Sequence, residues 1–175
     1  MRYGVPVSLP SERRQRRSSA YDGPLIDAID CRILTELQDD GRVTMAELGR
    51  RVNLSAPAVG ERVQRLEETG VITGYSALVD PRAIGYPIAA VVRIRPARRQ
   101  LHKVPDVARS TPEVVECHRV TGEDCYIAKL HLRSMDDLEG ILDRFAAVGQ
   151  TTTSIVHSAP VAARPLPLLD VPDDG

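Results

Sequence analysis

Apolar side chains recur at helical spacing in the first half of the chain. The earliest group lies at intervals of three and four residues and consists of Ile26, Ile29, Ile33 and Leu37. Side chains at these intervals share one face of a helix, and Gly41 follows the last of them shortly afterwards. The pattern therefore predicts a first helix over residues 25–38.

Two shorter helices are predicted by the capping residues in front of them. Thr44 stands three residues before Glu47, so its hydroxyl can accept from a free amide of the first turn while the carboxylate bonds back to the amide of the cap. Ser55 caps a third helix over residues 55–69, and Gly70 suits the left-handed position that follows. The inward stripes of these helices are Met45, Leu48 and Val52, then Val59, Val63 and Leu66.

A packing helix followed by two short helices and a tight turn is typical of a helix-turn-helix that reads DNA. A three-helix bundle that binds nothing has the same spacing, and this alternative stays open. With its apolar stripe inward, the third helix points a mixed set of side chains outward. These are Pro57, Glu61, Gln64, Arg65 and Glu68, with Gly60 and Arg62 at the flanks.

The outward face of the third helix carries groups that suit DNA. Gln64 can pair with adenine through its amide, and Arg62 or Arg65 can bind guanine or phosphate. The simpler alternative is that Glu61 and Arg65, four residues apart, pair on a solvated surface. The candidate DNA contacts are Ser55, Pro57, Arg62, Gln64 and Arg65, supported by Arg50 and Arg51.

The charge balance limits how DNA is held. The whole chain has a formal charge of -1, which excludes a polycation that coats nucleic acid by charge alone. Residues 25–74 hold six arginines against nine acids, whereas residues 1–24 hold five arginines against two acids. We therefore expect the N-terminal arm, which lacks any apolar periodicity, to be disordered and to bind phosphate or the minor groove.

The spacing changes after Pro87 from helical to strand-like. Residues 88–95, 114–121, 125–132 and 151–158 read as strands, and residues 101–110 and 134–147 read as helices. This β-α-β-β-α-β order is that of the ferredoxin-like fold, an antiparallel four-stranded sheet with both helices on one face. No remaining segment is apolar enough to cover the other face, so a second copy of the chain is expected to cover it in a two-fold dimer.

The predicted fold class is accordingly α+β, with five segments along the chain. Residues 1–24 form the arm, 25–74 the helix-turn-helix domain, 75–86 a linker strand and hinge, 87–158 the ferredoxin-like domain, and 159–175 a disordered proline-rich tail. No apolar run approaches the ~20 residues needed to cross a bilayer, and the basic N-terminus lacks the apolar core of a secretory signal. We therefore expect a cytoplasmic protein whose three cysteines, Cys31, Cys117 and Cys125, are thiols.

Several runs of sequence resemble the Lrp/AsnC (leucine-responsive, feast/famine) family of bacterial transcriptional regulators. In the first half they are IDCRIL at 29–34, LQDDGR at 37–42, Leu54-Ser55, ERV at 61–63, RLE at 65–67, GVI at 70–72 and Gly74-Tyr75; in the second half they are ECH at 116–118 and TGE at 121–123. The resemblance extends over residues 25–158. It implies a winged-helix-like DNA-binding domain, a strand through residues 75–79, and dimers that assemble further into octamers.

The resemblance also implies an effector, usually a free amino acid, held between second domains near the turn at 122–124. Carboxylates at Glu123 and Asp124 suit an ammonium group, and the exposed amides of a glycine turn suit a carboxylate. A solvated hairpin tip is the alternative. One departure is Cys125, where the family often has Asp, since the acid here lies one residue earlier. The candidate effector contacts are Thr121, Gly122, Glu123, Asp124, Cys125, Thr152 and Ser154.

Three other functions remain as alternatives or are excluded. The four histidines and three thiols match no zinc spacing, so neither a metal nor a cofactor is expected. An enzyme is not expected either, because the sequence has no phosphate loop, nucleophile elbow or zinc helix. One enzyme alternative is a sirohaem-decarboxylase-like activity, which some proteins that resemble this family carry. Another alternative is an architectural DNA-binding protein that needs no ligand.

Overall fold

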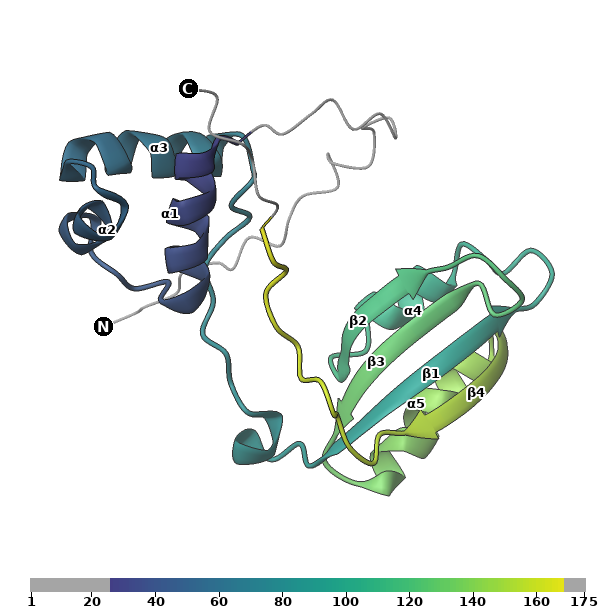
Figure 1. Cartoon of the computed structure of the whole chain (residues 1–175). Helices are drawn as coiled ribbons and strands as arrows, with labels where there is room; N and C mark the ends of the chain where they lie inside the picture. Colours follow the sequence, from purple (N-terminus) through teal and green to yellow (C-terminus); the bar gives the residue numbers. More distant parts are fainter. Residues whose placement is uncertain (1–25, 169–175) are drawn as a thin grey trace, which may run out of the picture. The chain divides into compact units, whose positions relative to one another are not determined.

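The computed structural model of the chain describes residues 26–168 and divides into two compact units (Figure 1). Of the described residues, unit 1 comprises 26–77 and 164–168, and unit 2 comprises 78–163. The expected basic arm at 1–24 lies outside the described residues. Each unit has its own hydrophobic core.

Unit 1 contains three helices, α1 (Ala28–Asp39), α2 (Met45–Val52) and α3 (Ala56–Glu68). Their inward stripes meet in one core, which confirms the periodicity argument. The buried members are Ile33, Leu34, Val43, Leu48, Val52, Val59, Val63 and Leu66.

Helix α1 begins three residues later than residue 25, where the spacing placed its start. Asp27 is its N-cap, and it forms a reciprocal capping box with Asp30, whose amide donates to the Asp27 carboxylate at 2.8 Å. Since an aspartate cap satisfies the free amides of the first turn, the helix starts just after Asp27, although Ile26 still packs against the core.

The caps of α2 and α3 form as predicted in all but one hydrogen bond. The Thr44 hydroxyl accepts from the Glu47 amide and the Ser55 hydroxyl from the Ala58 amide. The Glu47 carboxylate, expected to bond back to the cap, is instead bound by the arginines of α2. Gly49 is required here, because a β-carbon on it would collide with the Leu54 carbonyl oxygen.

The linker after α3 differs from the expectation. Residues 73–80 contain no strand, so the strand at 75–79 implied by the resemblance is wrong for this structure. Extended backbone becomes a strand only when a neighbouring strand accepts and donates its hydrogen bonds. The short helix η2 (Pro81–Ile84) follows, capped by Asp80, and the Tyr75 hydroxyl donates to Glu67 at 2.9 Å, which holds the start of the linker on unit 1.

Unit 2 has the predicted β-α-β-β-α-β order. Its elements are β1 (Ile88–Pro96), α4 (Val104–Arg109), β2 (Val114–Arg119), β3 (Tyr126–Leu132), α5 (Met135–Ala146) and β4 (Gly149–Ile155). The strands are antiparallel in the order β2-β3-β1-β4, which confirms the ferredoxin-like topology. Strand β4 starts two residues before residue 151, where its β-branched run begins, because Gly149 pairs closely with Pro96.

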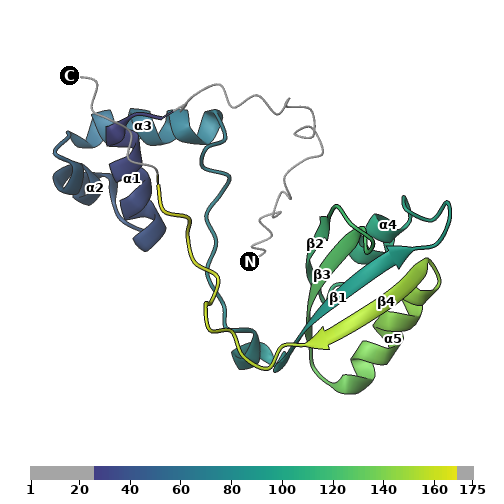
Figure 2. The ribbon, with the colours of Figure 1, turned by 45° about the vertical axis from the view of Figure 1, so that its right-hand side comes forward.

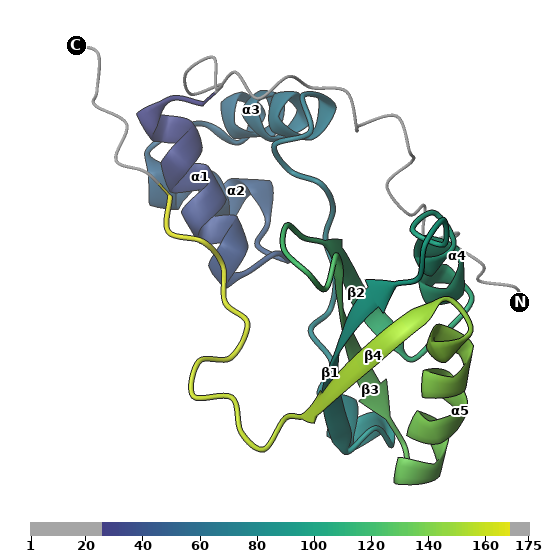
Figure 3. The ribbon, with the colours of Figure 1, turned by 90° about the vertical axis from the view of Figure 1, so that its right-hand side faces the viewer.

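Both helices cover one face of the sheet, as Figure 2 and Figure 3 show. That face is apolar and closes over α4 and α5 through residues such as Val92, Leu130 and Phe145, all of which are buried. The alternate residues of each strand lie on the opposite side, which we call the open face. Its members include Val91, Arg93, Arg95, Glu116, His118, Ile127, Lys129, His131, Thr152 and Ser154.

Candidate DNA-binding and effector sites

The outward face of α3 has the orientation predicted from its spacing. Pro57, Glu61, Gln64, Arg65 and Glu68 are exposed, whereas Gly60 and Arg62 are intermediate. Ser55 lies exposed at the N-terminal end of the helix, and its hydroxyl is used as the cap. The N-terminal end of α3 thus presents backbone amides that suit a phosphate.

The two α3 arginines, however, are held by an acid that the spacing argument missed. Asp30 of α1 is fully buried, and its two carboxylate oxygens accept from Arg62 at 2.8 Å and from Arg65 at 2.6 Å. Arg62 also donates to Asp27 at 2.7 Å. We call these four residues the Asp30 cluster. The cluster connects α3 to α1. The buried Asp30 carboxylate of α1 needs cationic partners to remain charged, and both of them come from α3.

The electrostatics of the Asp30 cluster agree with its geometry. Hydrogen bonds from Arg62 to Asp27 and Asp30 raise the pKa of the Arg62 guanidinium. Partial burial favours the neutral form of Asp27, yet Arg62 and the amides of Asp30 and Ile29 hold the pKa of Asp27 below its ordinary value. The signal for the cluster was in the sequence, because Asp30 has the spacing of the buried residues Ile33 and Leu34.

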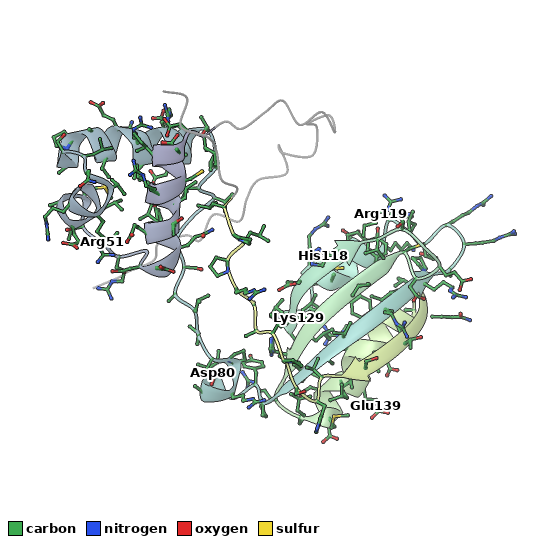
Figure 4. All side chains as sticks on the ribbon, viewed as in Figure 1. Arg51, Asp80, His118, Arg119, Lys129 and Glu139 are labelled. Carbon is green, nitrogen blue, oxygen red and sulfur yellow. The ribbon has the colours of Figure 1, made fainter. Side chains whose placement is uncertain are left out.

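Arg50, Arg51 and Gln64 also have intramolecular partners. Arg51, labelled in Figure 4, donates to Glu36 at 2.8 Å and to Glu47 at 2.9 Å, and Arg50 binds Glu47 as well. Gln64 donates to Glu68 at 2.8 Å. All seven residues belong to α2, α3 or the turn between them, and their contacts with DNA stay a prediction.

The turn proposed for the effector contains acids that pair with arginines of β1. Glu123 binds Arg95, while Asp124 lies 3.8 Å from Arg93 and 3.9 Å from Arg95. Gly122 has a φ of 111°, a conformation that favours glycine. Sequence reasoning missed both arginines, although their spacing of two residues on one strand places them on the same face as each other.

The other candidate effector residues divide between the two sides of the sheet. Thr152 is exposed on the open face opposite Arg93, and Ser154 is exposed opposite Val91. Thr121 is exposed in the turn. Cys125 differs, because it packs against the core on the helix side and has a φ of 45°. The structure therefore brings Thr152 beside the acid–arginine group and leaves the Cys125 thiol away from it.

Further charged side chains lie across the open face. His118 and Lys129, labelled in Figure 4, flank Glu116, with the Lys129 ammonium 3.7 Å from its carboxylate. Burial and the nearby Lys129 lower the pKa of His131. Within residues 26–168 no three acids, histidines or cysteines gather closely enough to bind a metal ion. Nor does that part of the chain contain a helix long and apolar enough to cross a membrane.

A helix-turn-helix unit joined to a ferredoxin-like unit with an acid-rich turn defines a regulator that combines a DNA-reading module with a ligand-binding module. Comparison with family models agrees. Residues 26–67 match the AsnC-type helix-turn-helix domain, and residues 89–166 match the Lrp/AsnC ligand binding domain. The chain belongs to the Lrp/AsnC family of transcriptional regulators.

Relatives and solved structures support this assignment over most of the chain. The regulator LrpC of Bacillus subtilis is 32% identical over 76% of this chain and 92% of its own length, and its structure superposes with a TM-score of 0.75 over 79% of this chain and 99% of that chain. LrpA of Mycobacterium tuberculosis is 38% identical over 73% of this chain and 86% of its own length. A Neisseria meningitidis regulator in complex with L-methionine is 28% identical, with a TM-score of 0.75 over 81% of this chain and 96% of that chain.

Proposed function

We propose that the chain regulates transcription by inserting the outward face of α3 into the major groove of DNA. The observation that carries this proposal is that Gln64 and Ser55, the N-cap of α3, are both exposed. Gln64 reads a base, and the amides near Ser55 bind a phosphate. Arg65, whose side chain is half exposed, has further guanidinium donors besides the one on Asp30, and these supply a phosphate contact.

Selection of duplexes from a random pool by the full chain tests the DNA proposal. We expect a consensus sequence, and we expect Gln64→Ala to lose discrimination at one position by about 1–3 kcal/mol. Gln38→Ala is the matched control, because Gln38 is exposed at the far end of α1. Failure to enrich any sequence at low salt refutes sequence-specific binding and favours the architectural alternative.

We propose further that an amino acid binds at the turn 122–124. A zwitterion carries one positive and one negative group about a single carbon, and the Glu123–Arg95 pair offers both complements at one place. The ammonium binds Glu123 or Asp124 and the carboxylate binds Arg93 or Arg95, so the effector replaces an internal ion pair without leaving a charge unpaired. The L-methionine complex of the Neisseria meningitidis regulator supports this choice of ligand.

Isothermal titration of the full chain with each of the twenty amino acids tests the effector proposal. Glu123→Gln and Arg95→Gln are each expected to weaken the binding of the responsive amino acid at least ten-fold. Glu139→Gln, an exposed position on α5 that Figure 4 labels, is the control and is expected to change nothing. The absence of heat with all twenty amino acids contradicts the proposal.

A two-fold dimer through the open face completes the proposed regulator, since it sets two α3 helices one or more DNA turns apart. In this proposal the dimers assemble further into octamers. The protein works in the cytoplasm and catalyses no reaction. Sedimentation tests the interface. Val91→Asp on the open face is expected to yield monomers, whereas Met135→Asp, which is exposed on α5, leaves the assembly unchanged. Monomers in the unmodified chain refute it.

A further inference from the structure

The described end of the chain packs on the helix-turn-helix core. Leu168 is partly buried against the cluster that contains Ile33, Leu48 and Leu66. Residues 164–168 accordingly belong to unit 1, although β4, which precedes them in sequence, belongs to unit 2. In Figure 1, Figure 2 and Figure 3 the last yellow residues lie beside α1.

The contact is particular to Leu168 and is not a general property of this apolar segment. Val161 is 67% exposed and Leu166 is 80% exposed, although both precede Leu168 by only a few residues. The match to the family's ligand-binding domain ends at residue 166, so Leu168 lies beyond it. The proline-rich composition of residues 159–168 favours an extended connection of limited freedom.

A second connection between the units follows from this contact. The linker after α3 joins unit 1 to unit 2 covalently, and the segment after β4 leads from unit 2 back to unit 1. Two connections restrict the orientation of unit 1 relative to unit 2 more than a single linker does, because each connection excludes orientations that the other allows.

We propose that residues 164–168 act as a strap, in which Leu168 docks on the helix-turn-helix core and couples the DNA-binding unit to the end of the ligand-binding unit. The docked leucine stabilises unit 1 by removing apolar surface from water. The closed connection also limits how freely unit 1 reorients. The strap concerns folding and motion alone, so it is testable without DNA or effector and stands apart from the proposed function.

Hydrogen exchange of the full-length protein tests the docking. Leu168→Asp is expected to speed exchange of the protected α1 and α3 amides about five- to ten-fold, because a half-buried leucine is replaced by a charge. Leu166→Asp is the matched control, since the same change two residues earlier falls on an exposed side chain. Amides of β1 and β3 in unit 2 are expected to keep their rates in both variants.

Nitrogen-15 relaxation tests the coupling with the same variants. In the unmodified chain and in Leu166→Asp, unit 1 and unit 2 are expected to report similar rotational correlation times. In Leu168→Asp the correlation time of unit 1 is expected to fall relative to that of unit 2. A chain truncated after Ala163 is expected to behave like Leu168→Asp. The strap is refuted if Leu168→Asp matches Leu166→Asp in both exchange and relaxation.

Discussion

Removal of the Arg62 and Arg65 guanidinium groups together is expected to destabilise unit 1 more than removal of the Asp30 carboxylate that they bind. Asp30→Asn leaves two arginines whose side chains are 26% and 53% exposed and can therefore bind water. The amide oxygen of the new asparagine still accepts from one arginine, so the cost is the loss of one charge-assisted hydrogen bond, about 1.5–3 kcal/mol.

The double substitution to methionine leaves a different residue unpaired. Asp30 is fully buried, so without Arg62 and Arg65 its charge keeps, from the part of the chain that the structure describes, a 3.2 Å hydrogen bond from the Asp27 amide. An uncompensated buried charge costs about 3–5 kcal/mol, which exceeds the cost of Asp30→Asn by roughly 2 kcal/mol. In exchange rates this difference corresponds to a factor of about 30.

Hydrogen exchange of the Ile33 amide, at a fully buried position of α1, measures the opening of unit 1 in each variant. Arg32→Met is the control, because Arg32 is exposed on the same helix and is expected to change exchange by less than two-fold. If Asp30→Asn speeds exchange of the Ile33 amide at least as much as the double substitution of Arg62 and Arg65, the buried charge of Asp30 does not set the free energy that the cluster contributes to unit 1.

Three further predictions follow from single positions. Gly149→Ala is expected to destabilise unit 2 and lower the melting temperature, because the added β-carbon collides with the backbone of β1. Gly140→Ala on α5 is the control and is expected to raise the melting temperature, because its β-carbon contacts nothing and alanine favours a helix. Gly60→Ala is expected to stabilise α3 by about 0.5–1 kcal/mol yet weaken DNA binding in an anisotropy titration; unchanged affinity contradicts close approach of α3 to DNA. Burial, together with a hydrogen bond to Glu67, raises the pKa of Tyr75 to about 12. This contribution to stability is present below the ordinary value near 10 and is lost as the pH rises toward 12, so Glu67→Gln is expected to lower the Tyr75 midpoint in carbon-13 NMR; an unmoved midpoint contradicts the contact.

Periodicity and capping predicted the elements of the fold because they are local properties of the chain. The inward stripes of α2 and α3 and the caps at Thr44 and Ser55 depend on residues within a few positions of one another. Helix α1 begins after the predicted residue 25 because Asp27 caps it, and the spacing of apolar residues does not detect a polar cap. The missing strand in the linker depends on a partner strand, which lies outside local sequence.

The candidate sites were less predictable because side-chain pairing joins residues far apart in the chain. Helical rotation placed Arg62 and Arg65 correctly at the edge and outward side of α3, yet their partner Asp30 lies more than thirty residues earlier. The same holds for the turn at 122–124, whose acids meet Arg93 and Arg95 across the sheet. Leu168 falls in the tail that is predicted to be disordered from its proline-rich composition, which does not detect a single docked leucine.

The Asp30 cluster gives the two sides of α3 different evolutionary freedom. Any substitution at Arg62 or Arg65 changes the attachment of α3 to α1, so such changes are constrained by folding whatever the operator sequence is. Gln64 and Glu61 touch neither Asp30 nor the core, so they can vary at little structural cost. If α3 reads DNA as proposed, a descendant of this regulator acquires a new operator through these two outward positions while its scaffold stays intact.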